Sequence, residues 1–330
     1  MMAGIVEVFT FLLCGAVCFM ACGLAEASVT KSNKTDMLIR TFVDIYEPSA
    51  LVPMQGGVLI FEDEGDEMAS MYQIGEDGSG LLLKKQYLGP IDININDIEG
   101  GATCDRGEVF VIGSHSLNKH GERSKKREQL LWLQINSKSK LSLVGSVGLW
   151  DDLTAGLQKI DPSMGGRIKD LNVEGLSCTG DSGALLIGLR NPLYDGQAIL
   201  FMLKNPYDIF SKKTSPKFST KPVLLDLGGT GVRSVTYHEG SGRFFLVSEV
   251  KGKKGKMRPR LWAWDGSRDH APIRMNFPGL KKLENIEGMN FLKHEGKEYV
   301  IFVCDDGNKK KKQGAHYAIV ETKWLKEKSK

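Results

Sequence analysis

Short apolar runs, separated by turns rich in Gly, Asp, Asn and Ser, follow one another along the chain from residue 49 onward. Strands of a few residues with turn signals between them are typical of all-β sandwiches, barrels and propellers. Helical periodicity is sustained only at 151–157, where we expect a helix and loop inserted over 151–170. The pattern therefore predicts an all-β protein.

Internal repetition narrows the fold class. Four similar segments each precede a polar turn and a strongly apolar run: Asp-Ile-Glu-Gly at 97–100, Asn-Val-Glu-Gly at 172–175, Gly-Val-Arg-Ser at 231–234 and Asn-Ile-Glu-Gly at 285–288. A weaker copy starts at Pro48. Propeller blades repeat about every 40–50 residues, and insertions lengthen the interval. We predict a β-propeller of five four-stranded blades, with six blades as the alternative.

The predicted blades account for the whole chain after an N-terminal segment. The last blade lacks a fourth strand, which residues 37–46 can supply, and this joining of the two termini removes an exposed edge. The expected blades are 48–93, 97–150, 172–228, 231–278, and 285–325 together with 37–46, in a single domain over 28–330.

Residues 1–27 have the pattern of a signal peptide. An apolar run at 9–23 is followed by Ala-Glu-Ala at 25–27, which is the small-residue spacing that signal peptidase reads. We expect an exported protein, periplasmic or secreted, with no membrane span after cleavage. Lipid attachment at Cys22 and an uncleaved anchor are the alternatives.

Cleavage would leave three cysteines: Cys104, Cys178 and Cys304. Because an odd number argues against a disulfide framework, we expect buried free thiols that pack as small apolar residues.

Propeller topology places the start of each first strand and the end of each second strand on the same face. Glutamates or an arginine begin first strands, and a histidine, an arginine and two aspartates end second strands. We therefore expect a carboxylate-lined channel mouth formed by Glu99, Glu174, Glu287, Arg233, His115, Arg190, Asp305 and Asp306.

This mouth has a structural and a functional interpretation. A glutamate repeated in several blades could accept backbone N–H groups of the next blade and hold the ring together. Alternatively, Glu99, Glu174, Glu287 and Asp305 could bind a hard cation such as Ca²⁺. Asp305, Asp306 and His115 are the candidate catalytic groups for acid–base chemistry. Arg190 and Arg233 could hold an anion through their planar guanidinium groups, or pair with carboxylates.

Loops between second and third strands add a basic rim to the same face. Its members are Lys119, Arg123, Lys125, Lys126, Arg127, Lys251, Lys253, Lys254, Lys256, Arg258 and Lys309 to Lys312. Such a rim raises the local concentration of an anionic partner, either a small molecule or an acidic macromolecule. The formal net charge of +4 and the predicted export argue against nucleic acid, and we expect a monomer.

Several of these motifs resemble domain-of-unknown-function family 3616. They are Gly-Ser-His-Ser at 113–116, Gly-Leu-Arg-Asn-Pro-Leu at 188–193, Leu-Asp-Leu-Gly-Gly at 225–229 with Gly-Val-Arg-Ser at 231–234, and Asp-Asp-Gly at 305–307. The resemblance implies an exported bacterial propeller, distantly similar to phytase-like and esterase-like propellers. It implies no particular reaction.

Two hypotheses follow, and the sequence leaves open whether the protein is an enzyme. The first is a binding scaffold with structural carboxylates and a basic rim. The second is a metal-assisted, phytase-like or esterase-like hydrolase of an anionic ester.

Overall fold

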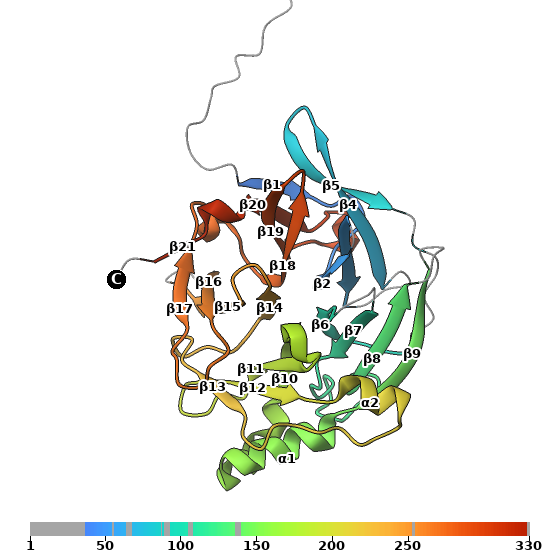
Figure 1. Cartoon of the computed structure of the whole chain (residues 1–330), viewed down its shortest axis with the longest axis vertical. Helices are drawn as coiled ribbons and strands as arrows, with labels where there is room; N and C mark the ends of the chain where they lie inside the picture. Colours follow the sequence, from blue (N-terminus) through green and yellow to red (C-terminus); the bar gives the residue numbers. More distant parts are fainter. Residues whose placement is uncertain are drawn as a thin grey trace, which may run out of the picture. The chain divides into compact units, whose positions relative to one another are not determined.

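The computed structural model describes residues 37–328 apart from 55, 64–67, 87, 89–92, 105–107, 136–139, 253 and 254. The predicted signal peptide lies outside these residues. The described chain forms five antiparallel sheets arranged in a ring (Figure 1), which is a five-bladed β-propeller. The predicted fold class is confirmed.

The blades are numbered along the chain, and the strands of each blade are given from the innermost to the outermost. Blade 1 contains β2 (Pro48–Met54), β3 (Gly57–Glu62), β4 (Ala69–Asp77) and β5 (Gly80–Gln86); blade 2 contains β6 (Ile98–Ala102), β7 (Glu108–Gly113), β8 (Gln129–Ile135) and β9 (Leu141–Gly148). Blade 3 contains β10 (Asn172–Cys178), β11 (Leu185–Asn191), β12 (Ala198–Leu203) and β13 (Val223–Leu225). Blade 4 contains β14 (Ser234–His238), β15 (Arg243–Lys251), β16 (Met257–Trp264) and β17 (Ile273–Asn276).

Blade 5 is closed by the N-terminal strand. Its sheet contains β18 (Ile286–His294), β19 (Lys297–Cys304), β20 (His316–Glu321) and β1 (Leu38–Thr41), where Leu38 pairs with Ile319. The predicted outer strand at 37–46 is therefore confirmed, although only four of its residues are in the strand. The chain then ends in β21 (Lys326–Glu327), which pairs with β17 as a fifth strand of blade 4. This last strand covers an outer edge that would otherwise offer unpaired backbone groups.

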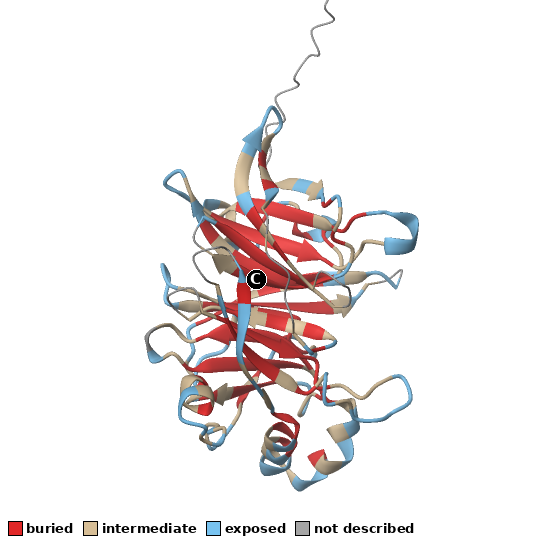
Figure 2. Cartoon of the chain, turned by 90° about the vertical axis from the view of Figure 1, so that its right-hand side faces the viewer, coloured by how far each residue is buried: buried red, intermediate tan, exposed pale blue. Residues whose placement is uncertain are grey.

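The hydrophobic core consists of five separate clusters, one between each pair of neighbouring blades. The second strands supply much of it, because both of their faces are covered, as in the fully buried run Val109–Ile112 of β7. In Figure 2 the strands are largely buried, whereas exposed residues gather in the connections. The blades are therefore held together mainly by apolar packing between their faces.

One insertion interrupts the repeat between blades 2 and 3. Helix α1 (Trp150–Ile160) and the 3-10 segment η1 (Pro162–Asp170) lie where we expected a helix and loop, and α1 buries Leu153 and Leu157 against blades 2 and 3. A second short helix, α2 (Pro206–Ser211), connects β12 to β13. No helix in the described part of the chain is both long and apolar enough to span a membrane.

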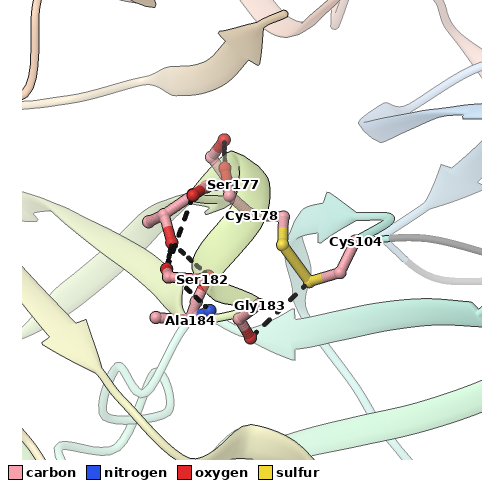
Figure 3. The surroundings of a disulfide bond; sticks show 7 residues. Cys104, Ser177, Cys178, Ser182, Gly183 and Ala184 are labelled. Carbon is pink, nitrogen blue, oxygen red and sulfur yellow. Dashed lines mark hydrogen bonds between the residues drawn. A yellow bond between two sulfur atoms is a disulfide. The ribbon is translucent and has the colours of Figure 1, made fainter.

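The expectation of three free thiols was wrong. Cys104 and Cys178 form a disulfide with 5.1 Å between their Cα atoms (Figure 3). Cys104 follows β6 and Cys178 ends β10, so the bond joins the neighbouring inner strands of blades 2 and 3 at the channel mouth where these strands end. An odd number of cysteines still permits one pair, and Cys304 is the buried free thiol that we expected.

Candidate functional site

The repeated motif forms the same irregularity in four blades. In each of these blades the first strand has one extra residue relative to the second strand, so the pairing shifts register there. The extra residues are Ser49, Glu99, Glu174 and Glu287. Such β-bulges redirect a side chain. The bulges therefore explain why the glutamates recur at equivalent positions at one channel mouth.

A glycine follows each of these glutamates because the next inner strand lies too close for a side chain. A Cβ atom on Gly100 would lie 2.9 Å from Leu176, one on Gly175 would lie 2.8 Å from Val232, and one on Gly288 would lie 3.0 Å from Leu51. Each contact reaches the adjacent blade. The Glu-Gly pair thus combines a redirected carboxylate with close packing of inner strands.

Arg233 is the centre of the charged cluster. Its side chain is only 7% exposed, and one guanidinium NH group lies 2.8 Å from Oε2 of Glu174 in blade 3. The other NH group pairs with Glu287 in blade 5, and Nε lies 3.3 Å from Glu249 in its own blade. One arginine therefore connects three consecutive blades.

Glu174 is occupied on both of its oxygens. Oε2 accepts from Arg233, while Oε1 accepts from Arg190 at 2.6 Å and from the amide of Asn172 at 2.9 Å. The carboxylate is 1% exposed, whereas Arg190 is 41% exposed. Arg190 thus pairs with a carboxylate, which is one of the two roles considered for it, and its binding of an anion stays a prediction. In the structural interpretation the glutamates would accept backbone N–H groups of the next blade, whereas Glu174 and Glu287 accept from arginine.

Carboxyl groups outnumber guanidinium groups in the cluster, which contains Glu99, Glu174, Glu249, Glu287, Asp305, Arg190 and Arg233. Burial raises the pKa of Glu287 well above its usual value, although Arg233 opposes this shift. Burial also raises the pKa values of Glu249 and Asp305. Burial alone would lower the pKa of Arg233, but Glu174, Glu287 and Glu249 raise it, so this guanidinium stays charged. The cluster therefore favours uptake of protons by its carboxyl groups.

Glu99 differs from the other two motif glutamates. It is half-buried and makes no hydrogen bond or ion pair within the described part of the chain. Burial and the nearby carboxylates of Glu174 and Glu287 raise its pKa well above the usual value. Glu99 is consequently a carboxyl group whose protonated form is favoured and which no described residue engages.

The candidate catalytic residues from second-strand ends lie in different surroundings. His115 is completely buried, with Nδ1 2.8 Å from the Gly113 carbonyl, and burial lowers its pKa to about 4. Asp306 accepts from the backbone N–H of His316 and lies 2.8 Å from the Nδ1 atom of that residue. Asp305 contributes to the field around the cluster, but its carboxylate makes no hydrogen bond to another described residue. The structure does not bring His115 and Asp306 into one hydrogen-bonded group.

The proposed calcium ligands are already engaged in part. Ca²⁺ needs six to eight oxygen ligands, yet Glu174 and Glu287 share Arg233. Among the described residues, three ligand atoms lie within 4.8 Å of one another only at Glu76, His294 and Glu295, outside the predicted set. Calcium binding at Glu99, Glu174, Glu287 and Asp305 stays a prediction, and the cation would compete with Arg233 for Glu174 and Glu287.

The loops of the basic rim separate into paired and unpaired members. Arg123 pairs with Glu128 and Asp151, Arg127 with Asp97, and Lys256 with Glu284. The remaining described lysines of the rim are exposed and form no ion pair with a described residue: Lys119, Lys125, Lys126, Lys251, Lys309, Lys310, Lys311 and Lys312. Lys253 and Lys254 lie outside the described residues.

Sequence reasoning missed Glu249 and the opposite channel mouth. Glu249 lies within β15, which extends to Lys251, and it is not part of the repeated four-residue motif that drew attention to the other carboxylates. The sequence signal that could have identified Glu249 is its position near the end of a second strand, as for Arg190 and Asp305.

At the opposite mouth a cavity of about 370 Å³ is lined by residues of all five inner strands. The apolar repeat alone gave no indication of it.

Comparison with known proteins adds a structural likeness only. No family model matches the chain, and no curated protein matches it either. A GH43 β-1,3-galactosidase shares 9% identity at a TM-score of 0.49, over 87% of this chain and 94% of that one. The GH62 α-L-arabinofuranosidase from Podospora anserina shares 10% identity at a TM-score of 0.42, over 86% and 91%. The major Malassezia sympodialis allergen Mala s 1 shares 10% identity at a TM-score of 0.47, over 88% and 96%. These values assign no activity.

Proposed function

We propose that this propeller is a binding protein that recognises an anionic partner through the unpaired lysines of its basic rim. The observation that carries the proposal is the contrast between the two charged regions of this face. The buried carboxylates are paired across blades through Arg233, whereas Lys309 to Lys312 and Lys119 are exposed without ion pairs to described residues.

The distribution of these lysines indicates the kind of partner. They belong to three separate loops, β7–β8, β15–β16 and β19–β20. Because these loops belong to three different blades rather than to one, they suit an extended polyanion, such as an acidic polypeptide, better than a single small anion. Exposed lysines attract such a partner through long-range fields that salt screens.

Binding of fluorescent poly-L-glutamate, followed by anisotropy, tests the proposal. The rim variant changes Lys309, Lys310, Lys311 and Lys312 to Gln. The control variant changes Lys204, Lys213, Lys217 and Lys221 to Gln; these exposed lysines lie in the β12–β13 connection on the opposite face. We expect the rim variant to bind at least about tenfold more weakly and the control to bind like the wild type. Equal losses of affinity in both variants would show that binding depends only on the net charge of the protein, which would contradict the proposal.

A second candidate function is hydrolysis of an anionic ester with Glu99 as the proton donor. It is favoured by the raised pKa of Glu99 and by the absence of a hydrogen-bonding partner for it in the described chain. General acid catalysis requires a carboxyl group that carries a proton to donate, and a raised pKa favours that form. Arg190, which is partly exposed, could hold the anion.

Glu99→Gln separates the two functions. If Glu99 is the general acid, the wild type hydrolyses aryl phosphate and aryl acetate substrates and the variant does not. If binding is the function, the wild type is inactive and the variant binds poly-L-glutamate like the wild type.

Unfolding of EDTA-treated protein with and without excess Ca²⁺ tests the metal-assisted form of this hydrolysis, because a ligand at about 100 times its Kd stabilises the folded state by about 2.7 kcal/mol. The binding function predicts no calcium-dependent shift.

A further inference from the structure

The cavity opposite the charged cluster lies on the propeller axis. It is lined by the ends of the inner strands β2, β6, β10, β14 and β18, through Met54, Ala102, Ser177, Thr236 and Asn290 among others. Its volume of about 370 Å³ falls in the range of small-molecule sites. A site built by every blade on rigid strands is held in a fixed shape.

Hydrogen bonds at the base of the cavity leave acceptor oxygens available. The Thr236 hydroxyl donates to Oδ1 of Asn290 at 3.0 Å, and the Asn290 amide donates to the Leu51 carbonyl at 3.2 Å. The Ser177 hydroxyl donates to the Cys178 carbonyl at 3.0 Å. These hydroxyl protons are already used, so Thr236 and Ser177 can still accept hydrogen bonds from a ligand.

Two further hydroxyl groups of the lining have no partner within the described chain, those of Thr103 and Tyr237. Each can donate and accept a hydrogen bond. The Tyr237 ring is fixed by Phe244, with 5.0 Å between ring centroids. The wall thus offers positioned hydroxyl groups that protein atoms do not use.

One side of the cavity is aromatic and rigid. The rings of Phe291 and His238 lie 4.3 Å apart, and His238 is held by Ser241 at 2.9 Å and by Glu298 at 2.9 Å. Glu298 also lines the cavity, and the remaining charged residues of the lining, Glu239 and Lys293, are exposed and of opposite sign. The one carboxylate in excess, that of Glu298, is therefore the one that lies against His238.

We propose that this cavity binds one small, uncharged polyhydroxylated molecule, about the size of a single sugar ring or an inositol. Such a molecule supplies hydroxyl groups for the acceptors at the base and for Thr103 and Tyr237, and it presents C–H faces to Phe291. The Cys104–Cys178 disulfide holds one wall of the cavity in place (Figure 3). The Sγ atom of Cys104 also lies 4.0 Å from the Gly183 carbonyl oxygen. The site is separate from the basic rim, which surrounds the opposite mouth.

Ligand-observed saturation-transfer NMR tests this assignment with the uncharged probes myo-inositol, D-glucose and D-xylose, and with the charged probes D-glucosamine and D-gluconate. Tyr237→Phe removes one hydroxyl and keeps the ring, and Thr103→Val removes the other and keeps the shape. Tyr46→Phe is the matched control, because Tyr46 is not part of the cavity lining and its backbone N–H donates to Glu62 at the end of β3. Cooperative thermal unfolding of each protein shows that it is folded.

We expect at least one uncharged probe to bind in the millimolar range and each cavity variant to weaken it about three- to tenfold, as the loss of one hydrogen bond implies. Tyr46→Phe and the rim variant should bind the probe like the wild type. If no uncharged probe binds the folded wild type, or if only a charged probe binds, the assignment is overturned. Unchanged binding by the folded cavity variants would also overturn it.

Discussion

At position 233 an arginine stands where the bulges of the other blades place serine or glutamate. This single difference lets Arg233 face Glu174 and Glu287 from the blades on either side. Buried ion pairs of this kind add little net stability compared with apolar packing, but removal of one partner leaves uncompensated charge. At the residue scale, the role of the cluster depends on Arg233.

Arg233→Met should therefore lower the free energy of unfolding by about 3–5 kcal/mol. Arg190→Gln removes another partner of Glu174, but Arg190 is 41% exposed, so its loss should cost no more than about 1 kcal/mol. Urea unfolding of both variants measures the difference. Similar small losses would show that the ion pairs across the blades contribute little.

His115 gives the protein a specific dependence on pH. Its pKa of about 4 in the folded state lies below the usual value of about 6.5. Between these values the unfolded chain binds a proton that the folded chain does not, so acidification through this window removes about 3 kcal/mol of stability. The raised pKa values of Glu99 and Glu287 act in the opposite direction, because the folded state then binds the extra proton.

A comparison with His115→Asn isolates the histidine, because asparagine tolerates the positive φ of 53° at this position. Unfolding free energies are measured from about pH 7 to about pH 4 for both proteins. The wild type should lose stability relative to the variant as the pH falls. Parallel profiles would mean that His115 binds protons equally in both states.

At the scale of elements, the glycine after each motif glutamate keeps the inner strands at their spacing. Gly175→Ala would bring a methyl group to 2.8 Å from Val232 and 2.9 Å from Val235. Overpacking of this kind costs about 1–3 kcal/mol. Gly78→Ala, in a turn with no heavy atom within 4 Å, is the control, and thermal unfolding should show a loss only for Gly175→Ala. Equal melting temperatures would show that the inner strands can move apart at no cost.

Strands whose character is set by local pattern were predictable, whereas pairings between distant segments were not. The apolar runs at 129–135 and 198–203 coincide with β8 and β12, whose residues are mostly buried. The disulfide depends on two inner strands that end side by side, which a count of cysteines cannot show. The glutamates were placed at one mouth by topology, but their arginine partners depend on bulge geometry.

At the scale of the whole molecule, the propeller separates two chemistries at its two channel mouths. The mouth where inner strands begin has buried ion pairs, and loops of three blades on this face carry exposed lysines. The mouth where they end has a cavity lined by hydroxyl, amide and aromatic groups. A ring of five blades allows this because each inner strand contributes one end to each mouth.

The salt dependence of poly-L-glutamate binding tests the central claim, that the basic rim binds a polyanion, most directly. Affinities of the wild type, the rim variant and the control variant are measured by anisotropy at ionic strengths from about 0.01 M to about 1 M, over which the screening length falls from about 30 Å to about 3 Å. We predict that the affinity of the wild type and of the control variant falls steeply with salt, and that the rim variant binds weakly with a much smaller slope. A rim variant that keeps the affinity and the slope of the wild type would contradict the claim.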